Sequence, residues 1–220
     1  MNSPLRKANC LIFDCDGTLV NSEGLCNLGL QKELQHYGVQ ADLADLTQRF
    51  RGRKLADICS ALSQQYGLEL DEDFIHSYRR TVALLFDASL QAFPGVIEVL
   101  QQLDLPMCVA SAGPPHKIRK ALSLTGLSRF FGERIYSSYD ISSWKPAPDL
   151  FLHAARQMGF APADCIVIED SEIGIQAAIA AGMQACWFGA AAQVATYPQV
   201  PRFSSMYELP CLLQCSQTFP

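Results

Sequence analysis

Short apolar runs bounded by turn-forming residues recur along the chain. They read CLIF (10–13), MCVAS (107–111), RIYSS (134–138), CIVIE (165–169) and QACWF (184–188). Apolar runs of this length are typical of strands that are buried on both faces of a sheet. The chain is therefore expected to contain a sheet built from strands that are far apart in the sequence.

Helix-like segments lie between the later apolar runs. One begins near 147–148, where proline suits a first helical turn, and an alanine-rich one spans 174–181 and ends at Gly182. Strands that alternate with helices predict an α/β fold with a Rossmann-like parallel sheet core. The proline-containing stretch 194–210 predicts an irregular edge of this sheet.

Residues 22–91 show a different pattern. They contain no convincing strand, but apolar positions recur at helical spacing, and Gly38, Gly52 and Gly67 punctuate the segments. The turn signal FPGV closes this block at 93–96. We expect a small helical cap domain at 21–91, inserted after the first strand of an α/β catalytic core formed by 1–20 and 92–220.

Composition excludes some classes of function. The 220 residues are 49% hydrophobic and 18% charged, with a net charge of −5. Nucleic acids and anionic membranes need clustered Lys and Arg, so neither is an expected partner. The first ten residues lack the apolar run of a signal peptide, and we expect a cytoplasmic protein. The nine cysteines contain no CxxC pair, which favours reduced thiols in the core.

Two carboxylates follow the first strand. Asp14 and Asp16 are two residues apart, so in an extended segment both point to the crevice beyond the carboxyl end of the sheet. A turn or a helix N-cap is the simpler interpretation of Asp beside Gly17 and Thr18. The five-residue pattern DCDGT is, however, rare by chance.

Other polar groups follow the later strands. Ser111 ends one strand, Glu169 and Asp170 end another, and Lys145 lies in the turn after a third. All of them are expected to converge on one crevice, where four carboxylates would repel one another unless a cation joins them. Carboxylate oxygens suit Mg²⁺, and this inventory suits phosphoryl transfer. Lys145 and Ser111 would bind the phosphate, together with the backbone at Gly17, Thr18, Ala112 and Gly113.

This constellation resembles the haloacid dehalogenase-like superfamily over essentially the whole chain. The resemblance implies that Asp14 is the nucleophile, which becomes an aspartyl-phosphate, and that Asp16 is the general acid and base. It also implies that Mg²⁺ binds to Asp14, to the backbone carbonyl of Asp16 and to Asp170, with Glu169 nearby or bound. An acid at position 16 favours a phosphate substrate over a carbon–halogen bond.

The loop RFRGRKLAD (49–57) resembles the substrate loop of the cap in the β-phosphoglucomutase-like branch. Arg51, Gly52, Arg53 and Lys54 are candidate substrate-binding residues, where cations would meet a second anionic group. A solvated helix start is the alternative interpretation. The mutase has an Arg and a His where this chain has Leu55 and Cys26, which disfavours a mutase.

The segments RTVALLFD, PMCVASAGP and YDISSWKPAPDLF resemble bacterial phosphatases of phosphorylated carbohydrates. The resemblance implies a Mg²⁺-dependent phosphatase that acts on a sugar phosphate or a phosphosugar acid such as 6-phosphogluconate. The expected partner is a small phosphorylated molecule, and the expected state is a monomer or weak homo-oligomer. A sugar phosphomutase is the alternative. A signalling phospho-acceptor or a non-catalytic binding protein is more remote, because Asp16 and the other site residues are all present.

Overall fold

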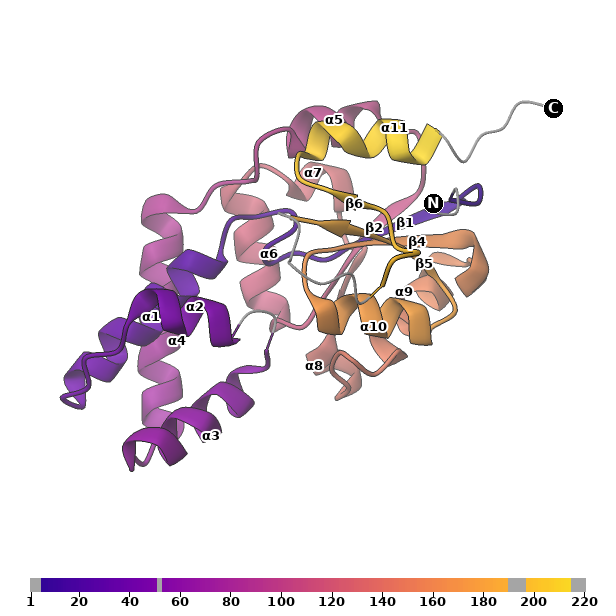
Figure 1. Cartoon of the computed structure of the whole chain (residues 1–220). Helices are drawn as coiled ribbons and strands as arrows, with labels where there is room; N and C mark the ends of the chain where they lie inside the picture. Colours follow the sequence, from indigo (N-terminus) through magenta and orange to yellow (C-terminus); the bar gives the residue numbers. More distant parts are fainter. Residues whose placement is uncertain (1–4, 51–52, 190–196, 215–220) are drawn as a thin grey trace. The chain divides into compact units, whose positions relative to one another are not determined.

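The computed structural model describes residues 5–50, 53–189 and 197–214. The chain divides into two compact units (Figure 1). Met1–Val20 and Ala92–Pro220 form one of them, which we call the α/β unit, and Asn21–Gln91 form the other, which we call the helical unit.

The α/β unit is built on a parallel sheet with the strand order β3-β2-β1-β4-β5-β6. Its strands are β1 (Cys10–Phe13), β2 (Met107–Ser111), β3 (Ile135–Ser137), β4 (Cys165–Glu169), β5 (Gln184–Phe188) and β6 (Arg202–Phe203). The strand order reverses at β1, since β2 lies on one side of it and β4 on the other. In such sheets the crevice beyond the carboxyl ends of the strands at this point is the usual place for a ligand. The predicted α/β fold is confirmed.

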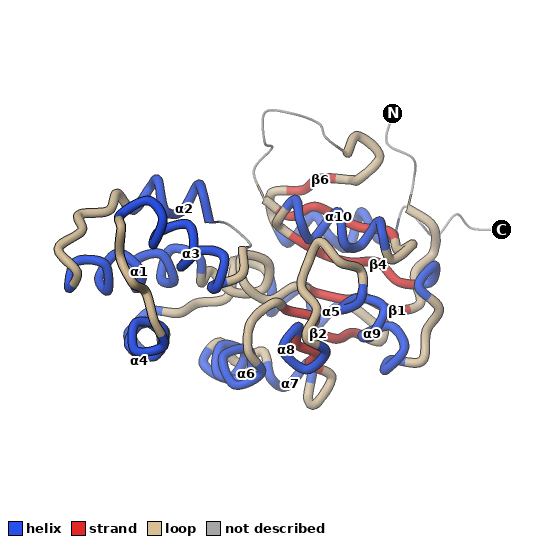
Figure 2. The backbone as a smooth tube through the Cα atoms, turned by 90° about the horizontal axis from the view of Figure 1, so that it is seen from below, coloured by secondary structure: helices blue, strands red, loops and turns tan. Residues whose placement is uncertain are grey.

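Helices cover both faces of the sheet. In Figure 1, α9 (Asp149–Met158) and α10 (Glu172–Ala180) lie below it, and α5 (Val96–Gln102) and α11 (Leu209–Gln214) lie above it. Figure 2 shows the same layers from below. The unit also contains the helices α6 (Pro115–Leu124), α7 (Ser128–Phe131) and α8 (Ser138–Ile141) and the short 3₁₀ turns Pro162–Asp164 and Met206–Glu208.

The central strands are buried on both faces, as their uninterrupted apolar sequences predict. Successive side chains of β1 point to opposite faces. Ile12 belongs to the core cluster that includes Phe151 of α9 and Ile175 of α10. Phe13 packs edge-on against Phe131 of α7, with ring centroids 6.1 Å apart. This packing holds the end of β1, and therefore Asp14, in a fixed place.

The stretch predicted as an irregular edge is more regular than expected within its described residues. Arg202–Phe203 pair with β5 as the edge strand β6, and the helix α11 follows. A two-residue strand is too short to show a hydrophobic period, so the sequence carried no signal for it.

The helical unit consists of α1 (Glu23–His36), α2 (Leu43–Phe50), α3 (Leu55–Tyr66) and α4 (Glu72–Ser89). Apolar side chains at helical spacing, among them Leu34, Leu62 and Phe74, form its core. Gly38 and Gly67 adopt positive φ angles after α1 and α3. The third predicted punctuating glycine, Gly52, lies outside the described residues.

Among the described residues, no helix is long and apolar enough to span a membrane. The described cysteines form no disulfide, and six of the eight are buried. The six buried cysteines therefore pack as small apolar side chains.

Candidate active site

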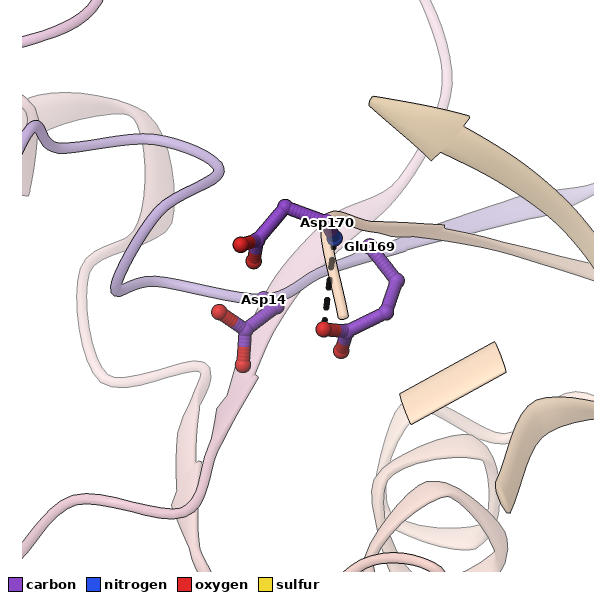
Figure 3. A group of neighbouring side chains, drawn as sticks. All are labelled: Asp14, Glu169 and Asp170. Atoms are coloured by element: carbon purple, nitrogen blue, oxygen red, sulfur yellow. Dashed lines mark hydrogen bonds between the residues drawn. The ribbon is translucent and has the colours of Figure 1, made fainter. Parts of the chain in front are cut away.

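Three acids meet where β1 and β4 end side by side. Phe13 of β1 is in register with Ile168 of β4, and the Asp14 N–H donates to the Ile168 carbonyl at 2.9 Å. Asp14 therefore lies beside Glu169 and Asp170, which follow Ile168. Figure 3 shows the three carboxyl groups gathered at this point.

These three acids could hold a metal ion. One carboxylate oxygen from each of Asp14, Glu169 and Asp170 lies within 4.8 Å of the other two, and all three residues are buried. Carboxylate oxygens are hard ligands that suit a hard divalent cation. Asp16 does not contribute its carboxylate to this group among the described residues, so its predicted contribution to the metal through the backbone carbonyl stays a prediction.

Lys145 is the buried cation of the site. Its Nζ donates to Asp14 Oδ1 at 2.5 Å and to Glu169 Oε2 at 2.6 Å, and its side chain is only 3% exposed. The ammonium also lies 5.0 Å from the ring centre of Phe151. Burial alone would lower the pKa of Lys145, but the two carboxylates outweigh burial and raise the pKa above its usual value. The side chain therefore stays an ammonium.

The pKa of Asp14 is shifted in the opposite sense to that of an ordinary ion-paired carboxyl. Burial, together with the charges of Glu169 and Asp170, raises the pKa of Asp14 well above its usual range, although Lys145 acts to lower it. If all three acids were ionised, their negative charge would exceed the positive charge of Lys145 in a buried site. A cation among them would favour the charged form of Asp14.

The backbone and side chain of Ser171 hold the carboxylate of Glu169. Glu169 Oε1 accepts from Ser171 Oγ at 2.7 Å, from the Ser171 N–H at 3.0 Å and from the Asp170 N–H at 3.2 Å. Ser171 also caps α10 by accepting from the Gly174 N–H. Ser171 was not predicted as a site residue, although a Ser just before a helix is a recognisable N-cap.

Gly17 and Thr18, both predicted to bind substrate, lie against Asp170. Thr18 Oγ1 donates to Asp170 Oδ1 at 3.1 Å. Gly17 has a φ of +86°, and a Cβ there would lie 2.4 Å from Asp170 Oδ2. A glycine is therefore required both by the backbone conformation and by the close approach of the acid. Trp187 of β5 donates its Nε1–H to the Asp170 carbonyl at 2.9 Å.

Asp16 lies beside Lys117, which was not among the predicted site residues. Lys117 Nζ donates to Asp16 Oδ1 at 3.0 Å and to Oδ2 at 2.9 Å. Lys117 lies in the first turn of α6, six residues after Ser111. That position near a predicted site residue was a signal for it, but a lone lysine on a helix is usually a solvated one.

Ser111 is buried at the end of β2, and its Oγ accepts from the Gly113 N–H at 3.2 Å. Ser137 of β3 donates to the Gly113 carbonyl at 2.6 Å and so holds the loop that contains Ala112. A Cβ on Gly113 would lie 3.5 Å from Asp16 Oδ2 and 3.6 Å from Ser111 Oγ. The structure thus brings the Ser111 loop next to Asp16.

The predicted cap cations belong to the helical unit. Arg51 and Gly52 lie outside the described residues. Arg53 is exposed, and Lys54 precedes α3 as its N-cap residue. Their contribution to substrate binding stays a prediction.

Comparisons with known proteins agree with this geometry. The model of the haloacid dehalogenase-like hydrolase family matches residues 8–182. The chain is 35% identical to the 6-phosphogluconate phosphatase of Escherichia coli (strain K12), over 94% of this chain and 95% of that protein. It is 31% identical to the fructose-1-phosphate phosphatase of the same organism, over 80% of this chain and 93% of that one.

A solved structure has the same fold. The crystal structure of a haloacid dehalogenase-like protein from Agrobacterium tumefaciens matches with a TM-score of 0.80 and 28% identity, over 94% of this chain and 97% of that one. The family match covers most of the chain, including every acid of the site and Lys145. The chain therefore belongs to the haloacid dehalogenase-like hydrolase family.

Proposed function

We propose that this protein is a Mg²⁺-dependent phosphatase that hydrolyses a small phosphorylated carbohydrate through an aspartyl-phosphate at Asp14. The observation that carries the proposal is the buried group of Asp14, Glu169 and Asp170 in contact with Lys145. The family and the phosphatase names of the relatives support the predicted class, a phosphoric monoester hydrolase.

The donor set fits a magnesium ion. Three buried carboxylates and one ammonium leave a formal excess of negative charge that a divalent cation would balance. The donors are hard oxygens, which Mg²⁺ prefers in combination with water and phosphate oxygens. Bound there, Mg²⁺ would neutralise charge on a substrate phosphate beside Asp14.

In the first step, a carboxylate oxygen of Asp14 attacks the phosphorus of the ester. The bond between phosphorus and the ester oxygen breaks, and the departing oxygen takes a proton from the carboxyl group of Asp16. Lys145 and Ser111 balance and orient the transferred phosphoryl group. The products of this step are the free sugar and the aspartyl-phosphate.

In the second step, a water molecule attacks the phosphorus of the aspartyl-phosphate. Asp16, now a carboxylate, accepts a proton from that water, and the bond between phosphorus and Asp14 breaks. Phosphate leaves, and both acids return to their starting states. Among the described residues, the Asp16 carboxylate is not part of the metal-binding group, and it contacts Lys117.

The proposed substrate is a phosphosugar acid of the 6-phosphogluconate type. The relative at 35% identity is a 6-phosphogluconate phosphatase, and the alignment spans nearly the whole of both chains. The cations Arg51, Arg53 and Lys54 precede α3 in the helical unit and would dock the carboxylate of such a substrate.

Phosphate release tests the proposed reaction. The wild-type protein should release phosphate from 6-phosphogluconate with Mg²⁺ and not with excess chelator, and Asp14→Asn should reduce the rate by at least about 1,000-fold. Asp104→Asn, at an exposed acid, is the matched control and should keep full activity. Wild-type turnover by Asp14→Asn would contradict the assignment of the nucleophile.

A matched pair of esters tests the substrate class. 6-Phosphogluconate and glucitol 6-phosphate differ only by a carboxylate in place of a hydroxymethyl group. Lys54→Ala should raise KM for 6-phosphogluconate about tenfold and leave KM for glucitol 6-phosphate nearly unchanged. Lys32→Ala, at an exposed lysine of α1, is the control and should change neither. Equal changes on both esters would remove Lys54 from carboxylate recognition, and an isomerised sugar phosphate as product would favour a mutase.

A further inference from the structure

The ion pair between Lys117 and Asp16 stands apart from the metal-binding acids. The Lys117 ammonium lies 2.9 Å and 3.0 Å from the two carboxylate oxygens of Asp16, so it contacts both. The two side chains are 25% and 27% exposed, whereas the Lys145 ammonium and its partners are almost fully buried. The site therefore has two lysines, and each one contacts a different catalytic acid.

The fold places the Lys117 backbone firmly. Pro115 begins α6, and the Lys117 N–H donates to the Pro114 carbonyl at 3.0 Å. The next residue, Ile118, is 1% exposed and anchors this turn in the core of the α/β unit. The ammonium reaches Asp16 from a rigid helix rather than from a loop, which is the better support for a precise geometry.

The carboxyl group of Asp16 lies beside the loop that follows β2. Asp16 directly precedes Gly17, whose φ is positive, and a Cβ on Gly113 would lie 3.5 Å from Asp16 Oδ2. The contact with both of its oxygens fixes the direction in which this carboxyl group points. Proton transfer needs it aimed at one oxygen, and a small misplacement costs a large factor in rate.

The pair has little to contribute to the fold. Partly exposed ion pairs of single lysines and acids add little to stability, because both groups are also well hydrated when apart. The ion pair between Lys117 and Asp16 is therefore expected to affect the reaction more than the stability of the fold.

We propose that Lys117 is a positioning residue for Asp16, and this inference rests on the proposed function, in which Asp16 transfers the proton. The ammonium contacts both oxygens of the Asp16 carboxylate and so orients the group. When one oxygen carries the proton, the ammonium keeps its contact with the other, and the protonated oxygen faces the departing ester oxygen. When that ester bond breaks, the electron pair goes to the departing oxygen, and the proton of Asp16 goes to the same oxygen.

Two esters separate this role from a structural one. The alkoxide that leaves from 6-phosphogluconate needs a proton, whereas p-nitrophenolate leaves without one. The ratio kcat/KM reports only the steps up to release of the first product, so it isolates the step in which Asp16 acts as an acid. Lys117→Met should lower kcat/KM for 6-phosphogluconate about 30-fold and for p-nitrophenyl phosphate less than about threefold. Lys117→Arg, which keeps a cation able to contact both oxygens, should restore most of the loss.

The matched control is Arg119→Met. Arg119 also lies on α6 and pairs with an acid, Glu133, at 3.0 Å, but both side chains are much more exposed. Arg119→Met should leave kcat/KM for both esters and the melting temperature unchanged. Equal losses on the two esters for Lys117→Met, or no loss on either, would overturn the positioning role while the wild-type reaction stands. A wild-type protein that hydrolyses neither ester would overturn the proposed function, and the inference with it.

Discussion

Gly174 in the first turn of α10 leaves the space that Glu169 occupies. A Cβ at position 174 would lie 2.0 Å from Glu169 Cδ and 2.2 Å from Oε2. The carboxylate has little freedom to move aside, since Ser171 holds one of its oxygens and Lys145 holds the other. Gly174→Ala should therefore displace Glu169 and weaken its contact with Lys145.

Two effects of opposite sign decide the stability of Gly174→Ala. Alanine is the better helix former by about 1 kcal/mol. The displacement of a buried, hydrogen-bonded carboxylate costs more: overpacking costs about 1–3 kcal/mol, and breaking a buried ion pair costs about 3–5 kcal/mol. Because Lys145 keeps Asp14 as a partner, we expect a net loss of about 2–4 kcal/mol in the free energy of unfolding. A shift of about 1 Å at Glu169 should lower kcat/KM about 100-fold.

Urea denaturation and phosphate release with Mg²⁺ measure the two effects. Gly24→Ala is the matched control, because Gly24 lies in the first turn of α1 with nothing within 4 Å of its Cβ position. It should keep full activity and gain up to about 1 kcal/mol in stability. A Gly174→Ala protein that is as stable and as active as wild type would refute the view that Glu169 is rigidly held.

Three further outcomes follow from the charges of the site. Lys145→Met should lower the free energy of unfolding by about 3–5 kcal/mol in urea denaturation, because it leaves buried carboxylates without their cation; a change under about 1 kcal/mol would contradict this. With a chelator present, the wild type should lose stability as the pH rises from about 4. The pKa of Asp14 is higher in the folded state than in the unfolded state, so above this pH the unfolded state releases its proton readily, whereas the folded state must hold the proton or ionise Asp14 in a buried acidic site. Asp14→Asn should flatten that slope above about pH 4, and an unchanged slope would point to other groups. Mg²⁺ should raise the melting temperature of the wild type and do so less for Asp170→Asn, and equal shifts would place the ion elsewhere.

The apolar runs predicted the sheet well. Each of the five runs contains a strand of the structure. The runs of β1, β2 and β4 were the clearest, because strands buried on both faces are mainly apolar whatever their tertiary partners. The edge strand β6 was missed, since an edge of two residues needs no such pattern. Its place depends on pairing with β5, which no local pattern records.

The acids of the site could be located from the sequence because each follows the end of a strand. The contacts that hold them could not, since they depend on which side chains the fold brings near. Lys117 and Asp16 are 101 residues apart, and Thr18 and Asp170 are 152 apart. The rule that alternate side chains point to the same side applies within a strand, and the chain turns at Gly17 just after β1. The rule therefore could not predict which side chain contacts Asp14 and which contacts Asp16.

The most direct test of the account is to trap the aspartyl-phosphate. Reaction of wild-type enzyme and Mg²⁺ with 6-phosphogluconate should be quenched during turnover with borohydride, which reduces an acyl phosphate to an alcohol and so converts the aspartate to homoserine. Peptide mass spectrometry should then find homoserine at position 14, in an amount that depends on substrate, and no such product in enzyme without substrate. Continued turnover with Asp14 unmodified, or homoserine at position 16 instead, would contradict the claim that Asp14 is the nucleophile.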